Sequence, residues 1–264
     1  DTAATVAAET LISSSLGVSN ITFNNFDAYS AVSNTADIVS AIEYQKAAAS
    51  VALVVDIGST GFVELIKKIE AAGDTVPEAY KISGQQNPFT TQKASEIMFD
   101  AIADAIIGGN IGDGKLKLFG SETGSVDDIA QKLEAIITPA AKIVLGDNYN
   151  NYKSAITNES LVLAAGVHRI ENKPFAPDSF PSTTETAIDA LTKIIQTQSV
   201  WQGDANRALE DDSTDNDWLS FNDTLTGGVT FTPVNSTGAE ITKNTAGYLE
   251  LNEGGYLLKV NGQP

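Results

Sequence analysis

The sequence predicts an α+β fold, in which a helix-rich, α/β-like body with a central apolar strand is followed by a small antiparallel β tail. Three observations lead to this prediction. Residues 51–57 (VALVVDI) form the most apolar run, and they are short and rich in β-branched side chains, as buried strands are. Residues 58–73 continue as a turn and a helix, because apolar side chains recur at helical spacing up to Gly73. Beyond residue 217 the chain becomes a series of short strand-like runs separated by glycines.

Further helices are predicted in the body from apolar periodicity and from capping signals. Thr90 or Thr91 is expected to cap one of them, and Ser125 with Asp128 resembles a capping box at the start of another. Pro139 is expected to kink or end that second helix. The expected helices cover residues 2–16, 34–49, 90–107, 125–138 and 182–199, and strands are expected at residues 18–26 and 115–119. Two further apolar runs, at residues 141–145 and 161–167, are compatible with either a helix or a strand.

These elements predict three parts along the chain. Residues 1–209 form a mixed α/β body, residues 210–217 an acidic hinge, and residues 218–264 a β-rich C-terminal subdomain. The last part has only 47 residues, which is a marginal size for an independent core. We therefore expect it to pack on the body or on a neighbouring molecule.

Composition and charge narrow the classes of function. The 264 residues are 42% hydrophobic, which is enough to bury a core, and they carry a net charge of −18. Such a chain repels nucleic acids and anionic membranes, so neither is expected as a partner. The longest apolar runs are shorter than the roughly 20 residues that a membrane span needs, so no membrane insertion is expected. The absence of cysteine excludes disulfides and thiolate metal sites.

The start of the chain and its composition favour an exported protein. The chain begins at Asp1 without an initiator methionine, and it is rich in Thr, Ser, Asn and Gly but poor in Lys. We expect a secreted, extracellular location at the cell surface.

The densest cluster of oxygen ligands lies in the predicted hinge. Asp211, Asp212, Asp215 and Asp217 are closely spaced hard ligands of the kind that Ca²⁺ prefers. The pattern lacks the order and the final glutamate of an EF-hand, and the alternative is a solvated acidic linker. These four residues are the predicted metal site, with Ca²⁺ as the cofactor. A weaker candidate lies at residues 147–151 (DNYNN).

Residues 56–61 (DIGSTG) look at first like the phosphate turn of the actin and sugar-kinase superfamily. That turn joins two strands, whereas here a helix follows. We interpret the segment as a strand-to-helix turn, with Ser59 or Thr60 as the N-cap.

No catalytic motif is complete, so the prediction is that the chain is not an enzyme. His168 is the only imidazole available as a base, and no G-x-S-x-G nucleophile elbow accompanies it. We interpret His168 as structural or exposed, while a pair of carboxylates acting as in glycosidases stays open. Asn158-Glu159-Ser160 is one of four N-glycosylation sequons in the sequence.

Aromatic residues gather near and beyond the hinge. They form either a stacking face for glycans or the small core of the tail. They are Trp201, Trp218, Phe221, Tyr248 and Tyr256. In the tail, residues 218–234 and 248–263, which include LTGGVTFTP and LLKVNGQ, resemble the opening strands of C1q/TNF-like jelly rolls on bacterial surface proteins. The resemblance covers under a fifth of the chain, and no functional residue carries over from it.

The predicted function is that of an exported structural protein, a self-assembling subunit of an extracellular filament or cell-surface layer. Its partner is another copy of the same chain, and strand addition to the β tail is expected to join subunits in part. Two alternatives stay open. One is a secreted hydrolase acting through carboxylates or His168, and the other is an extracellular module that binds surface glycans.

Overall fold

The computed structural model shows a mainly helical protein, so the predicted α+β fold class is wrong. The contacts divide the chain into two compact units, Asp1–Asp211 and Asp212–Pro264. The predicted borders of the body, hinge and tail stay a prediction. The structure describes residues 10–16, 18, 26–108, 125–172, 183–210, 230–235 and 254–259.

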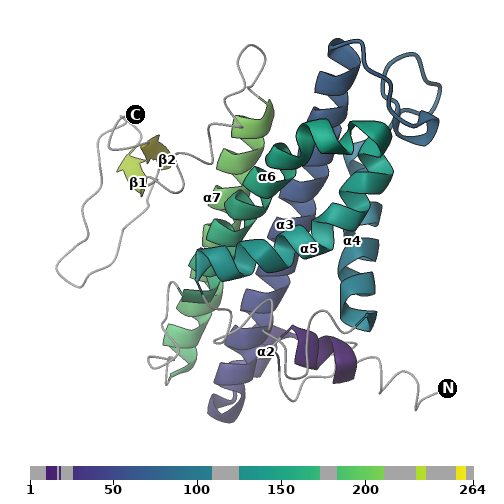
Figure 1. The fold of residues 1–264 in the computed structure, drawn as a ribbon. Helices are drawn as coiled ribbons and strands as arrows, with labels where there is room; N and C mark the ends of the chain where they lie inside the picture. Colours follow the sequence, from purple (N-terminus) through teal and green to yellow (C-terminus); the bar gives the residue numbers. More distant parts are fainter. Residues whose placement is uncertain are drawn as a thin grey trace. The chain divides into compact units, whose positions relative to one another are not determined.

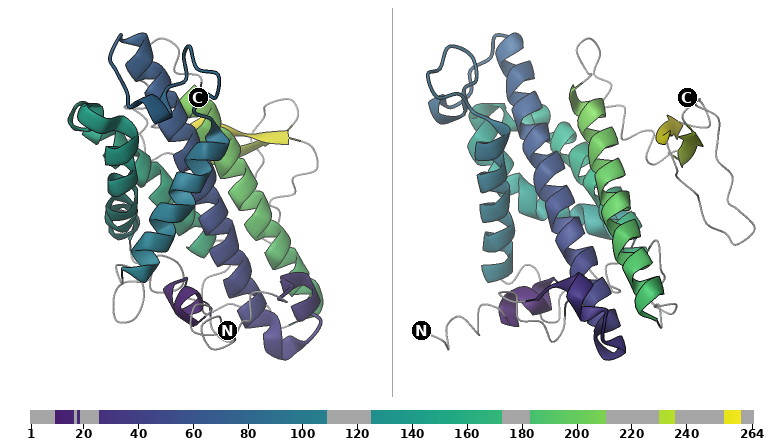
Figure 2. Two further views of the ribbon diagram at one scale, coloured as in Figure 1. Left: turned by 90° about the vertical axis from the view of Figure 1, so that its right-hand side faces the viewer. Right: turned by 180° about the vertical axis from the view of Figure 1, so that it is seen from behind.

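The first unit is built around α3 (Ile38–Ala71), a helix of 34 residues. Figures 1 and 2 show α3 running through the middle of this unit, with α4 and α7 on either side of it and the pair α5 and α6 packed across it. The other helical elements are α2 (Ala28–Ala31), η2 (Thr35–Asp37), η3 (Glu78–Tyr80), α4 (Thr91–Ile107), α5 (Val126–Leu145), η4 (Gly146–Asn148), α6 (Tyr149–Asn172) and α7 (Thr184–Glu210). Residues 10–15 are helical as well.

The predicted central strand, residues 51–57, and the turn predicted after it both lie inside α3. A helix covered on nearly all sides is apolar nearly all round, so residues 51–57 show no amphipathic pattern. Without that pattern, a buried helix and a buried strand look alike, and β-branched content favoured the wrong one. The two runs left open, residues 141–145 and 161–167, are helical too.

Local signals placed several helix ends correctly. Gly73 ends α3 as predicted: with φ of +83° it allows its own N–H to bond to the carbonyl of Glu70, and the N–H of Asp74 to bond to that of Ile69. Thr90 caps α4, and Ser125 with Asp128 forms the capping box of α5.

Two helices run further than predicted. α5 continues through Pro139 to Leu145, and α7 continues past residue 199 to Glu210. In both cases packing against neighbouring helices holds residues whose local sequence signals an end.

Side-chain contacts fix the direction of the neighbours of α3. Lys46 of α3 bonds to Glu171 near the end of α6, whereas Gly61 lies against Glu159 near the middle of α6, so the two helices are antiparallel. Gln202 and Asn206 of α7 bond to Ala52 and Asp56 of α3 in the same order, so α3 and α7 are parallel.

α3 also has the length and apolarity of a membrane span. The segment Thr35–Ala71 has a mean hydropathy of 1.6 in its most apolar window, and 78% of that window is buried inside the protein. The core helix of a soluble protein shows the same combination.

In the second unit the described residues form a single hairpin. β1 (Thr230–Asn235) pairs antiparallel with β2 (Gly254–Lys259), from Thr230 opposite Lys259 to Asn235 opposite Gly254. The strand-like runs predicted at residues 228–232 and 256–260 overlap these two strands, and those predicted at residues 218–221, 239–242 and 248–251 lie outside the described residues. One two-stranded ladder of this size does not amount to the β layer that the predicted fold class requires.

The core of the first unit depends on large side chains of α3 that solvent does not reach. We expect Phe62→Ala to lower the free energy of unfolding by about 3–5 kcal/mol, because it leaves a cavity where Phe62 is 0% exposed. Phe99→Ala is the matched control, since Phe99 is 53% exposed and its loss costs much less. Urea unfolding followed by circular dichroism measures both, and equal losses would contradict the central place of α3.

Candidate functional site

The chemically unusual part of the described chain lies where α6 crosses the middle of α3. Gly58 and Gly61 of α3, three residues apart, leave a notch on one side of the helix. The side chain of Glu159 fills this notch together with Met98 of α4. A Cβ atom at Gly61 would lie 2.7 Å from the carboxyl carbon of Glu159, and one at Gly58 would lie 2.7 Å from the terminal methyl of Met98. An alanine at either position would therefore require the Met98 or Glu159 side chain to move.

Glu159 is a buried acid without a counter-charge. It is 1% exposed, and neither carboxyl oxygen has a hydrogen-bond partner within the described residues. Burial raises its pKa well above the usual value, because the charged form loses its hydration. Burial therefore favours the neutral, protonated form of this carboxyl group.

The hydroxyl groups beside the notch bond within their own helices. Ser59 donates to the carbonyl of Val55, Thr60 donates to that of Asp56 at 3.1 Å, and Ser160 donates to that of Ile156 at 2.9 Å. The predicted role of Ser59 or Thr60 as an N-cap is thus wrong, because both sit in the helix interior.

Three further polar contacts tie α3 to its neighbours. The Lys46 ammonium group donates to the carbonyl of Glu171 at 2.5 Å, and burial lowers the pKa of Lys46 against the opposing effect of the Glu171 and Glu43 carboxylates. Asn206 donates to a carboxylate oxygen of Asp56 at 2.8 Å, and Gln202 donates to the carbonyl of Ala52 at 3.2 Å. These contacts position helices, as does the bond that the buried Ser50 hydroxyl of α3 donates to a carboxylate oxygen of Glu171 at 3.5 Å.

The predicted calcium site lies outside the residues that the structure describes. Asp211, Asp212, Asp215 and Asp217 all lie outside them, so Ca²⁺ binding there stays a prediction. Within the described ranges, no group of three or more His, Asp or Glu side chains converges as metal ligands would.

The weaker candidate for a metal site was residues 147–151. There Asn148 is buried and its side chain donates a hydrogen bond to the carbonyl of Thr75 at 2.7 Å, which is a structural contact between loop and helix. His168 lies half-buried within α6. Its position neither supports nor contradicts the hydrolase alternative.

Among the aromatic residues considered for glycan stacking, Trp201 is 5% exposed on α7 and packs against Gly166 of α6. It belongs to the helical core and not to an open binding face. Trp218, Phe221 and Tyr248 lie outside the described residues.

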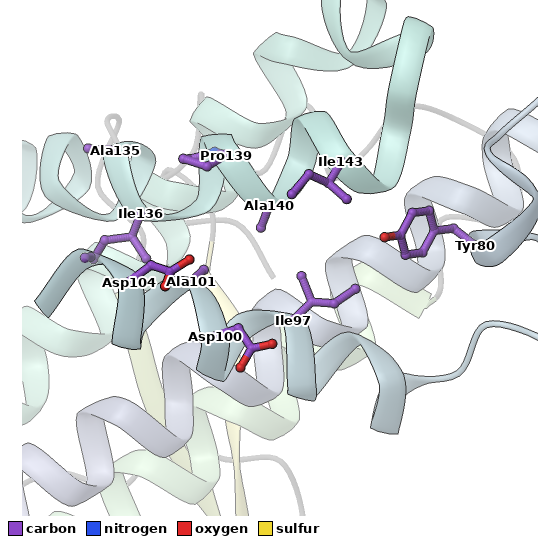
Figure 3. Close-up of a pocket in the computed structure, with 11 residues that line it drawn as sticks. Tyr80, Ile97, Asp100, Ala101, Asp104, Ala135, Ile136, Pro139, Ala140 and Ile143 are labelled. Carbon is purple, nitrogen blue, oxygen red and sulfur yellow. The ribbon is translucent and has the colours of Figure 1, made fainter. Parts of the chain in front are cut away.

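A pocket opens between α4 and α5, with a volume of about 370 Å³ (Figure 3). Ile97, Ile136 and Ile143 supply apolar wall, while Asp100 and Asp104 of α4 supply carboxylates. This combination of an apolar wall and a few polar groups is typical of small-molecule sites. The pattern of the sequence did not indicate this pocket, because its lining side chains on α4 and on α5 are 30 or more residues apart.

Comparison with protein-family models finds no match for this chain, and comparisons with curated proteins and with solved structures find none either.

The contact between Gly61 and Glu159 can be tested by a double-mutant cycle. We expect Gly61→Ala to destabilise the protein by about 1–3 kcal/mol, because its Cβ would overlap the carboxyl group. In the background of Glu159→Ala the same change removes no contact, and it should stabilise by up to about 1 kcal/mol through helix propensity. Gly203→Ala, at an exposed position in α7, is the matched control and should stabilise in both backgrounds. Additive effects of Gly61→Ala and Glu159→Ala in chemical unfolding would contradict the proposed fit.

The raised pKa of Glu159 predicts a loss of stability as the pH rises. Above the unfolded-state pKa, about 4.3, the folded state keeps a proton that the unfolded state releases. The folded protein therefore loses stability from there up to its own, higher pKa. We expect the stability of Glu159→Met relative to the wild type to increase over that range, by up to about 1.4 kcal/mol per pH unit.

Urea unfolding at a series of pH values measures this difference. Glu96→Met changes an exposed glutamate of α4 in the same way and should show no such trend. A difference between wild type and Glu159→Met that is constant with pH would show that Glu159 ionises normally.

Proposed function

We propose that this protein is an exported structural subunit that assembles with copies of itself outside the cell. The observation that carries the proposal is an apolar stripe on the outer face of α4. Phe99, Ala103 and Ile107 are spaced four residues apart, so they lie on one side of the helix. Phe99 is 53% and Ile107 75% exposed, and Ala103 is exposed as well.

Within the first unit, α4 packs against its neighbours through its other face only. Ala94, Met98, Ile102 and Ala105 are buried there. A helix with a second, exposed apolar face gains free energy when that face is covered by another molecule. A helix face of this kind fits association between copies.

Charge sets the conditions for such assembly. Each copy carries −18, so copies repel one another at low ionic strength. Salt screens this repulsion, with a Debye length near 8 Å at about 0.15 M, and leaves the apolar contact in place. Assembly should therefore increase with salt, and Ca²⁺ should act at lower concentrations than Na⁺.

The hairpin of β1 and β2 gives a second route to assembly. In the described part of the second unit each strand pairs on one side only, and an unpaired strand edge accepts a strand from another chain. Strand addition between subunits is thus part of the proposal, next to the stripe of α4.

Replacing both large residues of the stripe should abolish assembly through α4. We expect Phe99→Asp with Ile107→Asp to shift the protein toward monomers at high salt, because two new charges would be buried in the contact. Val39→Asp with Ile188→Asp is the control: these side chains are 43% and 42% exposed, lie on other helices and give the same change in charge.

Light scattering after size-exclusion chromatography and negative-stain microscopy measure the outcome across a salt and calcium titration. Wild-type protein that stays monomeric throughout would overturn the proposed function. Assembly by the stripe variant equal to that of the wild type would overturn the role of α4.

A further inference from the structure

The pocket between α4 and α5 has the shape of a small-ligand site. Its volume of about 370 Å³ lies within the roughly 300–1,000 Å³ of such sites and is too small for a peptide helix. The space exists because Ala101 and Ala105 of α4 face Ala135 and Ala140 of α5 across it. Around these small residues the wall is apolar (Figure 3).

The charged groups of the pocket all have the same sign. Asp100 and Asp104 are one helical turn apart, and both line the pocket. Neither side chain has an ion pair or hydrogen bond within the part of the chain that the structure describes. None of the residues that line the pocket is basic. With −18 on the whole chain, the pocket attracts cations and repels anions.

A backbone acceptor adds to the two carboxylates. Pro139 lies inside α5 and has no N–H, so the carbonyl of Ala135 lacks its regular helical donor. Ala135 and Pro139 both line the pocket. A ligand with N–H groups would supply the donor that the helix lacks there.

We propose that this pocket binds a small organic cation that has a primary ammonium group and a short apolar body. The ammonium group lies between the Asp100 and Asp104 carboxylates, with the Ala135 carbonyl as a further acceptor. The apolar body lies along Ile97, Ile136 and Ile143. A bare metal ion would leave this apolar wall uncovered, and a carboxylate ligand would be repelled.

Titration calorimetry of the 264-residue chain at low salt, with hexylammonium as the probe, tests the site. Hexan-1-ol and hexanoate have the same chain without the positive charge. We expect saturable binding of hexylammonium at one site, and binding of the alcohol and the acid at least about tenfold weaker. Binding of hexanoate as tight as that of hexylammonium would overturn the proposal, as would the absence of saturable hexylammonium binding.

Variants assign the binding to this pocket. Asp100→Asn and Asp104→Asn should each weaken hexylammonium binding about fivefold, as expected for a partly exposed ion pair. Glu96→Gln removes the same charge from an exposed position of α4 outside the pocket and should leave the affinity within about twofold. Equal effects of all three variants would show attraction to the whole surface and not to this site.

Two further variants test the wall and the carbonyl. Ala101→Phe fills the half-buried edge of the pocket and should abolish binding. Pro139→Ala restores an N–H for the Ala135 carbonyl, so it should weaken hexylammonium more than hexyltrimethylammonium, which has no N–H.

Thermal unfolding by circular dichroism confirms that each variant folds. Light scattering run alongside tests whether a second copy of the chain fills the pocket. Loss of assembly in Ala101→Phe without any hexylammonium binding to the wild type would assign the pocket to that second copy and overturn the proposed ligand.

Discussion

The close approach of α6 to α3 at Gly58 and Gly61 is the contact on which the rest of the helical unit depends. It lets the carboxyl group of Glu159 enter the side of α3, where any Cβ at Gly61 would collide with it. α5 packs mainly on α6, so the depth at which α6 sits also sets how far α5 stands from α4. The pocket lies between α4 and α5, which contact each other less extensively than α5 contacts α6.

The buried and half-buried polar groups in and around α3 differ in what satisfies them. Lys46 and Asp56 bond to α6 and α7, so their cost of burial is offset by contacts that fix direction and register. Glu159 of α6, which packs against Gly61, has no such partner among the described residues, and its burial favours the protonated form. A leucine or methionine would pack in the same place without this cost. Glu159 therefore stands out as a core residue that stability alone does not explain.

Sequence reasoning succeeded where structure is determined locally. Thr90, Ser125 and Gly73 cap helices through bonds to residues within five positions, and all three were predicted. The prediction of a central strand at residues 51–57 was wrong because a helix buried on all sides has no amphipathic pattern. Once residues 51–57 were interpreted as a strand, residues 58–61 looked like a turn after it. Gly58 and Gly61 are three residues apart, and this spacing was the signal of a helix face that another helix approaches closely.

The same distinction explains why the site was missed. Glu159 stands between Ile156 and Leu163 on one helical face of α6, and a charge on an apolar face was visible in the sequence. Asp100 and Asp104 gave no signal, because acids on a helix surface are ordinary and their apolar partners come from α5. On α4 these two acids lie along one side of the stripe of Phe99, Ala103 and Ile107. A cation bound between them would reduce the charge beside that stripe, so ligand binding and self-association would each strengthen the other by the same factor.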